Sequence, residues 1–190
     1  MLIESFLDYL RLERNYSERT IVSYRTDLRE FGGFLENTEA ELDWKKVHAD
    51  HVRNWMVSLM EGGKAATSVN RKLSSLRSFY RFLLRKKLVA VNPMLKIVGP
   101  KKKKPLPFFV REKDMNRLLD EIPFKEGFEG CRDRTILEMF YATGMRLSEL
   151  IGLNDADVDF ASKLIKVTGK RNKQRLIPFG KELEEDLNLY

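Results

Sequence analysis

The 190-residue sequence predicts a mainly α-helical protein of two domains, the second of which also contains a small antiparallel β-hairpin. Three observations support this fold class. Apolar residues recur at steps of three and four through most of the chain. A stretch rich in proline and lysine, GPKKKKPLP at residues 99–107, separates two such periodic regions. The helical period is lost only near residues 164–179, where short strands are expected.

Four amphipathic helices are predicted for residues 1–98. The first covers residues 2–13, and the second begins after Ser17, a good N-cap residue. The third ends at the glycines at positions 62 and 63, and the fourth covers residues 67–87. Each helix places an apolar stripe on one face. Four such helices with short connections form a small bundle.

Residues 99–107 are expected to link the two domains. Their three prolines exclude a helix, and four successive lysines repel one another and extend the chain. The second domain is therefore predicted to cover residues 108–190.

The second domain is predicted to begin with three helices, followed by two strands. The helices are expected at residues 111–122, 132–142 and 145–153. The helix at 132–142 is predicted to turn Ile136, Leu137, Phe140 and Tyr141 toward the core. The strand candidates are residues 164–168 and 174–179, and GKRNK forms the turn between them. The last eleven residues resemble the opening of another helix.

The positive charge is concentrated in the first half of the chain. Residues 1–104 contain 21 Lys and Arg against 12 Asp and Glu, whereas residues 105–190 contain 14 against 16. Residues 62–111 contain fourteen basic side chains and no acid, although a solvated helix normally mixes the two signs. Nucleic acid is the natural counter-ion. A membrane surface is the weaker alternative, because the basic residues lie on segments that also carry a core-facing apolar stripe.

The predicted DNA-binding residues lie on the outer faces of the second and fourth helices and in the linker. Arginines separated by short hydroxyl side chains allow a helix to approach a duplex closely. An ordinary basic surface is the alternative interpretation. The predicted residues are Thr20, Ser23, Arg25, Arg71, Lys72, Ser75, Ser78, Arg81, Arg85, Lys101, Lys102, Lys103 and Lys104.

Several other classes of protein and site are disfavoured. No apolar run is long enough to span a membrane, and the N-terminus carries acids where a signal peptide would carry bases, so a cytoplasmic protein is expected. The single cysteine, Cys131, excludes an internal disulfide. His48 and His51 are expected to have a surface or capping role, and no metal site is predicted.

The segment ATGMRLSEL, residues 142–150, contains an arginine in an unusual place. Gly144 is expected to end one helix, which leaves Arg146 in the first turn of the next, where an anion is favoured. Arg146 therefore binds either a phosphate or a nearby acid, such as Glu149 or one of those in NDADVD. The spacing supports both interpretations equally.

Two long motifs, ATGMRLSELIGLNDADVD and IKVTGKRNKQRLIPFG, strongly resemble the start of the catalytic domain of tyrosine recombinases, the phage-integrase and Xer-like family. SERTIVSYRTDLREFGGFL and VNRKLSSLRSFYRFLLRKKLVAVNP resemble the second and fourth helices of that family's core-binding domain. The resemblance covers nearly the whole chain in the right order. It implies a core-binding domain at residues 1–98 and the amino-terminal part of a catalytic domain at residues 108–190.

The resemblance also assigns roles to three residues. Arg146 matches the family's first catalytic arginine, which holds the scissile phosphate, and Lys170 matches the lysine that protonates the 5′-oxygen leaving group. Glu149 matches a supporting acid that orients the site. Arg171 departs from the family, because Xer-like members usually have glycine at that point of the turn.

The family's His-x-x-Arg motif and its nucleophilic tyrosine have no match in residues 180–190, and Tyr190 is not taken for the nucleophile. The chain is therefore expected to be an amino-terminal piece of a recombinase and to bind double-stranded DNA without cutting it. The intact enzyme would form a 3′-phosphotyrosyl link, need no cofactor, and assemble with other protomers, as a tetramer, on paired sites. Two alternatives are a non-catalytic relative that occupies recombination sites and a helical protein–protein adaptor.

Overall fold

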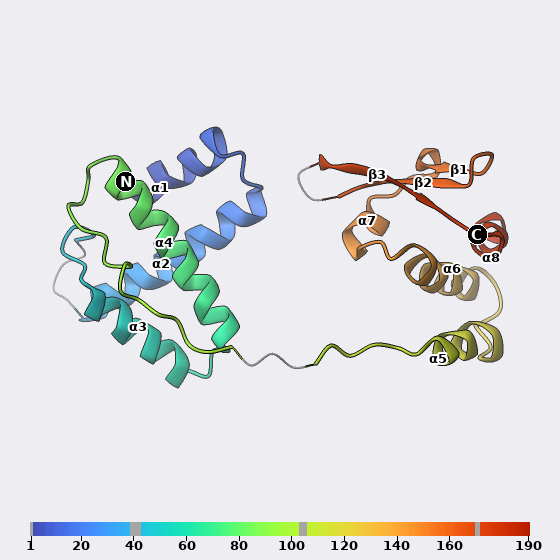
Figure 1. Ribbon diagram of the computed structural model, residues 1–190, viewed down its shortest axis with the longest axis horizontal. Coiled ribbons are helices and arrows are strands. Elements are labelled where there is room, and N and C mark those ends of the chain that lie inside the picture. The colour runs from blue at the N-terminus through green and yellow to red at the C-terminus, as the bar shows by residue number, and fades with distance from the viewer. Residues whose placement is uncertain (1, 39–42, 103–105, 170–171) are drawn as a thin grey trace. The chain divides into compact units, whose positions relative to one another are not determined.

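The computed structural model describes residues 2–38, 43–102, 106–169 and 172–190 (Figure 1). The chain divides into two compact units, Met1–Pro105 and Leu106–Tyr190. The predicted fold class is confirmed, because the elements are mainly helices and the strands form one small antiparallel sheet. Within the described ranges, no helix is long and apolar enough to cross a membrane. The predictions for Lys103, Lys104, Lys170 and Arg171 lie outside the described residues.

The first unit contains the four predicted helices. α1 covers Leu2–Asp8 and continues as the π-helical turn η1, Tyr9–Glu13. α2 covers Glu18–Thr38 and α3 covers Ala49–Glu61. α4 covers Ala66–Arg85. The third helix begins with a contact between the two histidines, since Nδ1 of His51 accepts a hydrogen bond from the backbone N–H of His48, 3.0 Å.

Aromatic rings from several helices form the core of the first unit. The rings of Phe31 and Trp55 lie 4.9 Å apart, and those of Trp44 and Phe79 lie 5.0 Å apart in an edge-to-face arrangement. Phe6 joins them from α1 and is fully buried. A fully buried side chain of this size contributes about 1.5–3 kcal/mol through removal of apolar surface from water. This core holds α1 against α2 and α4, and so positions the outer faces described below.

The segment after α4 returns along that helix and completes the first unit. Met94 and Ile97 are buried in the same core. Nη2 of Arg77 donates to the carbonyl of Ile97 at 2.9 Å, and Nδ2 of Asn70 donates to the carbonyl of Pro100 at 2.8 Å. The first residues of the proline-rich stretch are thus attached to α4.

The second unit contains short helices and a three-stranded sheet (Figure 1). Its elements are α5 Glu112–Asn116, η2 Arg117–Glu121, α6 Phe128–Thr143, α7 Leu147–Ile151, η3 Asp155–Asp157, β1 Val158–Asp159, β2 Leu164–Thr168, β3 Gln174–Pro178 and α8 Lys181–Leu189. The predicted hairpin corresponds to β2 and β3, which pair antiparallel with Ile165 opposite Ile177 and Thr168 opposite Gln174. β1 adds a third strand on the other side of β2. It is only two residues long, too short to produce an alternating pattern in the sequence.

The core of the second unit joins the sheet to α6 and α8. Ile165 and Val167 of β2 alternate with exposed residues, as expected of a strand with one buried face. They pack with Met139 of α6, Leu183 of α8 and Phe179, which follows β3.

The predicted core face of α6 is wrong in part. Ile136 and Tyr141 are 36% and 45% exposed, whereas Met139 and Thr135 are buried. The helix carries apolar residues on more than one side, so its sequence period does not select a single face. Its contacts with α8, among them a hydrogen bond from Thr135 Oγ1 to the carbonyl of Asp186, show which side is inward.

Candidate nucleic-acid interface and phosphate site

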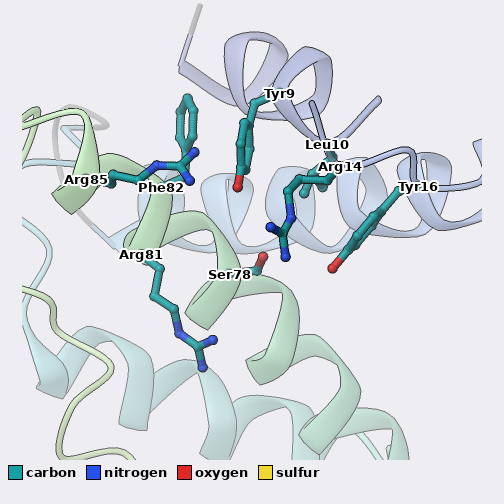
Figure 2. Close-up of a pocket in the computed structure, with 8 residues that line it drawn as sticks. All are labelled: Tyr9, Leu10, Arg14, Tyr16, Ser78, Arg81, Phe82 and Arg85. Carbon is teal, nitrogen blue, oxygen red and sulfur yellow. The ribbon is translucent and has the colours of Figure 1, made fainter. Parts of the chain in front are cut away.

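A hollow between the N-terminal helix and α4 gathers arginine and aromatic side chains (Figure 2). Its volume is about 260 Å³. The lining residues are Tyr9, Leu10, Arg14, Tyr16, Ser78, Arg81, Phe82 and Arg85. Three of these eight side chains are cationic and none is acidic, so the hollow favours an anion.

The arginine side chains of this hollow differ in their neighbours. The guanidinium of Arg85 lies over the ring of Tyr9, 4.2 Å from its centroid, which is a cation–π contact. Arg14 points toward Ser78 across the hollow (Figure 2). Among the described residues, no carboxylate forms an ion pair with Arg14 or Arg81. Both arginines can therefore offer their donors to a ligand.

Ser78, Arg81 and Arg85 were predicted from α4 alone, whereas Tyr9, Arg14 and Tyr16 were not predicted. These three come from η1 and the short loop before α2. The motif ERNY, in which Arg14 and Tyr16 lie two residues apart, was a weak signal in the sequence. Only the packing of α1 and η1 against α4 brings it to the same surface.

About two turns before Ser78 on α4, Arg71 lies in a different environment. Asp27 of α2 is completely buried and accepts hydrogen bonds from Arg71 Nη1 at 2.6 Å and Nη2 at 2.8 Å. Lys72 Nζ and Ser75 Oγ donate to the same carboxylate at 3.2 and 2.7 Å. A buried carboxylate is tolerated only when it is paired in this way. We call Asp27, Arg71, Lys72 and Ser75 the α2–α4 lock.

The α2–α4 lock corrects two predicted DNA contacts. The side chains of Lys72 and Ser75 are buried, and Lys72 also pairs with Glu30, so neither side chain is exposed on the outer face of α4. Arg71 keeps 49% of its side chain exposed while it binds Asp27. Sequence reasoning missed Asp27. Its signal was an acid placed beside the apolar stripe of α2, directly before Leu28, where a charge needs a buried partner.

The predicted residues of α2 and the linker have mixed surroundings. Ser23 is half-buried and accepts a hydrogen bond from Arg71 at 2.6 Å. Thr20 is also half-buried, and its hydroxyl lies 3.0 Å from that of Ser17. Arg25 pairs with Glu4 at 3.1 Å, which weakens the field that it presents to a phosphate. Lys101 and Lys102 are exposed.

In the second unit, Arg146 and Glu149 meet Arg175, which sequence reasoning missed. Gly144 ends α6 in the left-handed conformation, φ +59°, and Arg146 then caps α7. Oε1 of Glu149 accepts from Nη1 of Arg146 and from Nη1 of Arg175, both at 2.8 Å. Oε2 accepts from the backbone N–H of Arg146 at 2.9 Å and from Nη2 of Arg175 at 2.8 Å.

Burial differs sharply between the members of this group. The side chain of Glu149 is 1% exposed, whereas that of Arg146 is 68% exposed. Hydrogen bonds from Arg175 and from the backbone of Arg146 lower the pKa of Glu149 to about 2, so it stays ionised. Of the two interpretations of Arg146, the pair with Glu149 is therefore present. This pair occupies one terminal nitrogen of the guanidinium, and within the described residues no other hydrogen bond or ion pair engages the Arg146 side chain.

Gly169 brings the hairpin turn close to Glu149. A Cβ atom at this position would lie 2.8 Å from Oε1 of Glu149, so a larger residue would push the carboxylate away. The backbone N–H of Gly169 donates to the carbonyl of Lys173 at 2.8 Å and closes the turn. Gly169 directly precedes Lys170 in the sequence.

No metal or histidine cluster accompanies this site in the described part of the chain. His48 and His51 lie at the start of α3 in the first unit. Cys131 is a free, partly buried thiol on α6. In the described ranges, no group of three His, Cys, Asp or Glu side chains is arranged to hold a metal ion.

Family models match both units. The model described as the phage integrase N-terminal SAM-like domain matches residues 3–87, and the phage integrase family model matches residues 109–189. The tyrosine recombinase XerC of Staphylococcus carnosus (strain TM300) is 42% identical over 187 residues, which are 98% of this chain and 62% of that protein. XerC of Pediococcus pentosaceus is 42% identical over 189 residues, 100% of this chain and 63% of that protein. The chain thus spans less than two thirds of the length of these relatives.

Solved structures have the same fold. The Tn1549 transposon integrase (aa 82-397) in complex with circular intermediate DNA is matched with a TM-score of 0.70 and 16% identity, over 99% of this chain and 63% of that one. A lambda integrase(75-356) dimer bound to a COC′ core site is matched with a TM-score of 0.70 and 16% identity, over 98% and 64%. At this identity the likeness supports the fold alone.

Proposed function

The chain belongs to the phage integrase family of tyrosine recombinases, and from this premise we propose that it grips duplex DNA and binds the phosphate at which a site-specific recombinase breaks the strand. The observation that carries this proposal is the environment of Arg146. Its guanidinium is anchored at one nitrogen by a buried carboxylate and is otherwise exposed. Such a fixed cation suits a phosphate whose charge grows during strand cleavage.

The first unit would supply most of the grip on the duplex. Arg14, Arg81 and Arg85 surround a hollow without acids, and Lys101 and Lys102 extend the basic surface along the chain. Contacts of this kind neutralise phosphates and carry no sequence information by themselves. The hydroxyl of Ser78 and the half-exposed Arg71 are the candidates for contacts with base edges.

In the whole enzyme, strand exchange would proceed by phosphoryl transfer to a tyrosine. The tyrosine hydroxyl attacks the phosphodiester, a 3′-phosphotyrosyl bond forms, and the bond to the 5′-oxygen breaks. Arg146 neutralises the nonbridging oxygens, Glu149 orients Arg146, and Lys170 gives a proton to the leaving oxygen. A 5′-hydroxyl from a partner strand then reverses these steps. The covalent link conserves the phosphodiester energy, so no nucleotide is consumed. Several protomers, four in the intact assembly, would meet on paired sites.

A gel-shift series with a duplex oligonucleotide tests this proposal. We expect the association constant of the 190-residue chain to fall on the order of a hundredfold or more between about 50 and 200 mM salt, because bound phosphates release counter-ions. A denaturing gel of the same mixtures should show no covalent protein–DNA adduct, since no residue of this chain is assigned as the nucleophile.

Two outcomes would contradict this proposal. A folded chain that ignores the duplex in dilute buffer, or binds it without salt dependence, would favour the helical adaptor. A covalent adduct would show that one of the chain's own tyrosines can attack the phosphate.

A further inference from the structure

Among the described residues, Glu149 accepts four hydrogen bonds, and half of them come from Arg175 on β3. These four bonds match the roughly four acceptor positions of a carboxylate. The two bonds from Arg175 are parallel and both 2.8 Å long, the bidentate geometry in which guanidinium and carboxylate bind most strongly. Arg146 contributes one guanidinium bond and one backbone bond. Glu149 is therefore held more firmly by Arg175 than by the side chain of Arg146.

The charges of the three groups do not cancel. Two guanidiniums share one carboxylate, which leaves one positive charge. Without Arg175, the buried Glu149 and Arg146 would form a neutral pair, and the attraction of that pair for a phosphate would be much weaker.

The two arginines are committed to Glu149 to different degrees. Arg175 turns both of its terminal nitrogens to Glu149, whereas Arg146 uses Nη1 alone for the carboxylate, and their side chains are 41% and 68% exposed. Arg146 is therefore the arginine that keeps more of its guanidinium for a ligand.

We propose that Arg175 is a positioning residue of the phosphate site: it holds and neutralises Glu149, so that Arg146 keeps its charge and its donors for a DNA phosphate. This inference rests on the proposed role of Arg146. The same contact attaches the hairpin to α7, because Gly169, at the far end of β2, lies against the carboxylate that Arg175 binds. Arg175 thus serves both the charge and the geometry of the site.

A charge-removal cycle tests this inference in the 190-residue chain. Arg175→Gln leaves Glu149 to neutralise Arg146, and duplex binding should weaken on the order of tenfold, as for loss of a phosphate contact. Arg175→Gln combined with Glu149→Gln removes both charges, and binding should return to within about threefold of the unmodified chain. Arg175→Lys keeps the positive charge but cannot form the bidentate contact. Its duplex affinity should therefore lie between those of Arg175→Gln and the double variant. Arg117→Gln is the matched control, an exposed arginine paired with Glu121 on η2, and should change nothing.

The double variant separates this role from a direct contact or a purely structural one. If Arg175 touched DNA itself, or only stabilised the fold, removing Glu149 as well would not restore binding. A double variant as weak as Arg175→Gln, with both chains folded by circular dichroism, therefore overturns the inference.

A carboxyl-carbon NMR titration of Glu149 provides a readout that does not depend on DNA. We expect Arg175→Gln to raise the pKa of Glu149 from about 2 toward its ordinary value, and Arg175→Lys to raise it less. An unchanged midpoint in Arg175→Gln would overturn the inference. If the unmodified chain failed to bind the duplex, the proposed function would fall, while the titration would still decide whether Arg175 keeps Glu149 ionised.

Discussion

Arg71 and Arg81 lie ten residues apart on α4, and their surroundings give them different tasks. Arg71 binds the buried Asp27 with both terminal nitrogens and also donates to Ser23. Arg81 lines the hollow next to Arg85 and Ser78, and within the described ranges it forms no ion pair. Replacing Arg71 should therefore affect stability as well as duplex binding, whereas replacing Arg81 should affect duplex binding alone.

We expect Arg71→Ala to lower the free energy of unfolding by about 1–3 kcal/mol, because Asp27 loses its bidentate partner while buried. Arg81→Ala should leave stability within about 0.5 kcal/mol and should weaken duplex binding instead. The loss of binding free energy should reach about 1–3 kcal/mol if Arg81 reads a base and be smaller if it meets only phosphate. Urea unfolding and duplex titration of both variants measure this difference. If Arg71→Ala and Arg81→Ala were equally stable, the structural role assigned to Arg71 would be wrong.

The ionisation of Glu149 gives the second unit a defined acid response. Its pKa in the folded chain, about 2, lies below the ordinary value of 4.5. The ionised form therefore contributes stability that is fully present above about pH 4.5 and is lost as the pH falls toward about 2. We expect Glu149→Gln to be less stable than the unmodified chain at pH 7, and this difference to shrink across that window. Urea unfolding at several pH values measures it, and a constant difference down to about pH 2 would contradict the assignment.

The individual site residues were predictable to different degrees. Arg146 and Glu149 share a short motif, so their proximity could be read from a spacing of three residues. Arg175 is 26 residues from Glu149, and only the pairing of β2 with β3 and the packing of α7 bring the two together. Asp27 and Arg71 are separated by 44 residues and meet only through helix packing. The sequence pattern around one residue carries no information about its contact with a residue so far away in the chain.

At the scale of elements, periodicity located the helices well because most of them have one apolar face. α2 and α4 are long helices with one apolar face, and the start of α2 and both ends of α4 were predicted within a few residues. The continuation of α1 as a π-helical turn was not predicted, because a shift in hydrogen-bond pattern leaves no mark on the apolar stripe. The buried face of α6 could not be predicted from its apolar stripe, because its apolar residues lie on several sides of the helix.

Two substitutions in α6 test which face is buried. Met139→Ala removes a buried side chain and should destabilise the second unit by about 2–4 kcal/mol through lost contacts and a cavity. Ile136→Gln replaces a partly exposed apolar residue on the same helix and should change stability by less than about 1 kcal/mol. Thermal unfolding of both variants measures this. The opposite ranking would mean that α6 turns its Ile136 side to the core.

At the scale of the whole molecule, the two units differ in net charge and in the sites that they carry. The basic excess of residues 1–104 coincides with the unit that carries the hollow and the α2–α4 lock. The second unit is nearly balanced in charge, and in it Arg146 and Arg175 share the single carboxylate of Glu149. Under the proposed function, general attraction to DNA and the placement of one phosphate would rest on separate cores.

The α2–α4 lock has a thermodynamic consequence for complex formation. Three donors from two successive turns of α4 converge on Asp27, so a shift of α4 along α2 by one residue would break several bonds at once. The helices thus keep their register in the free protein, and the outer face of α4 is preorganised. In the proposed complex with DNA, little conformational entropy would be lost in ordering that surface. More of the electrostatic attraction would then be retained as affinity.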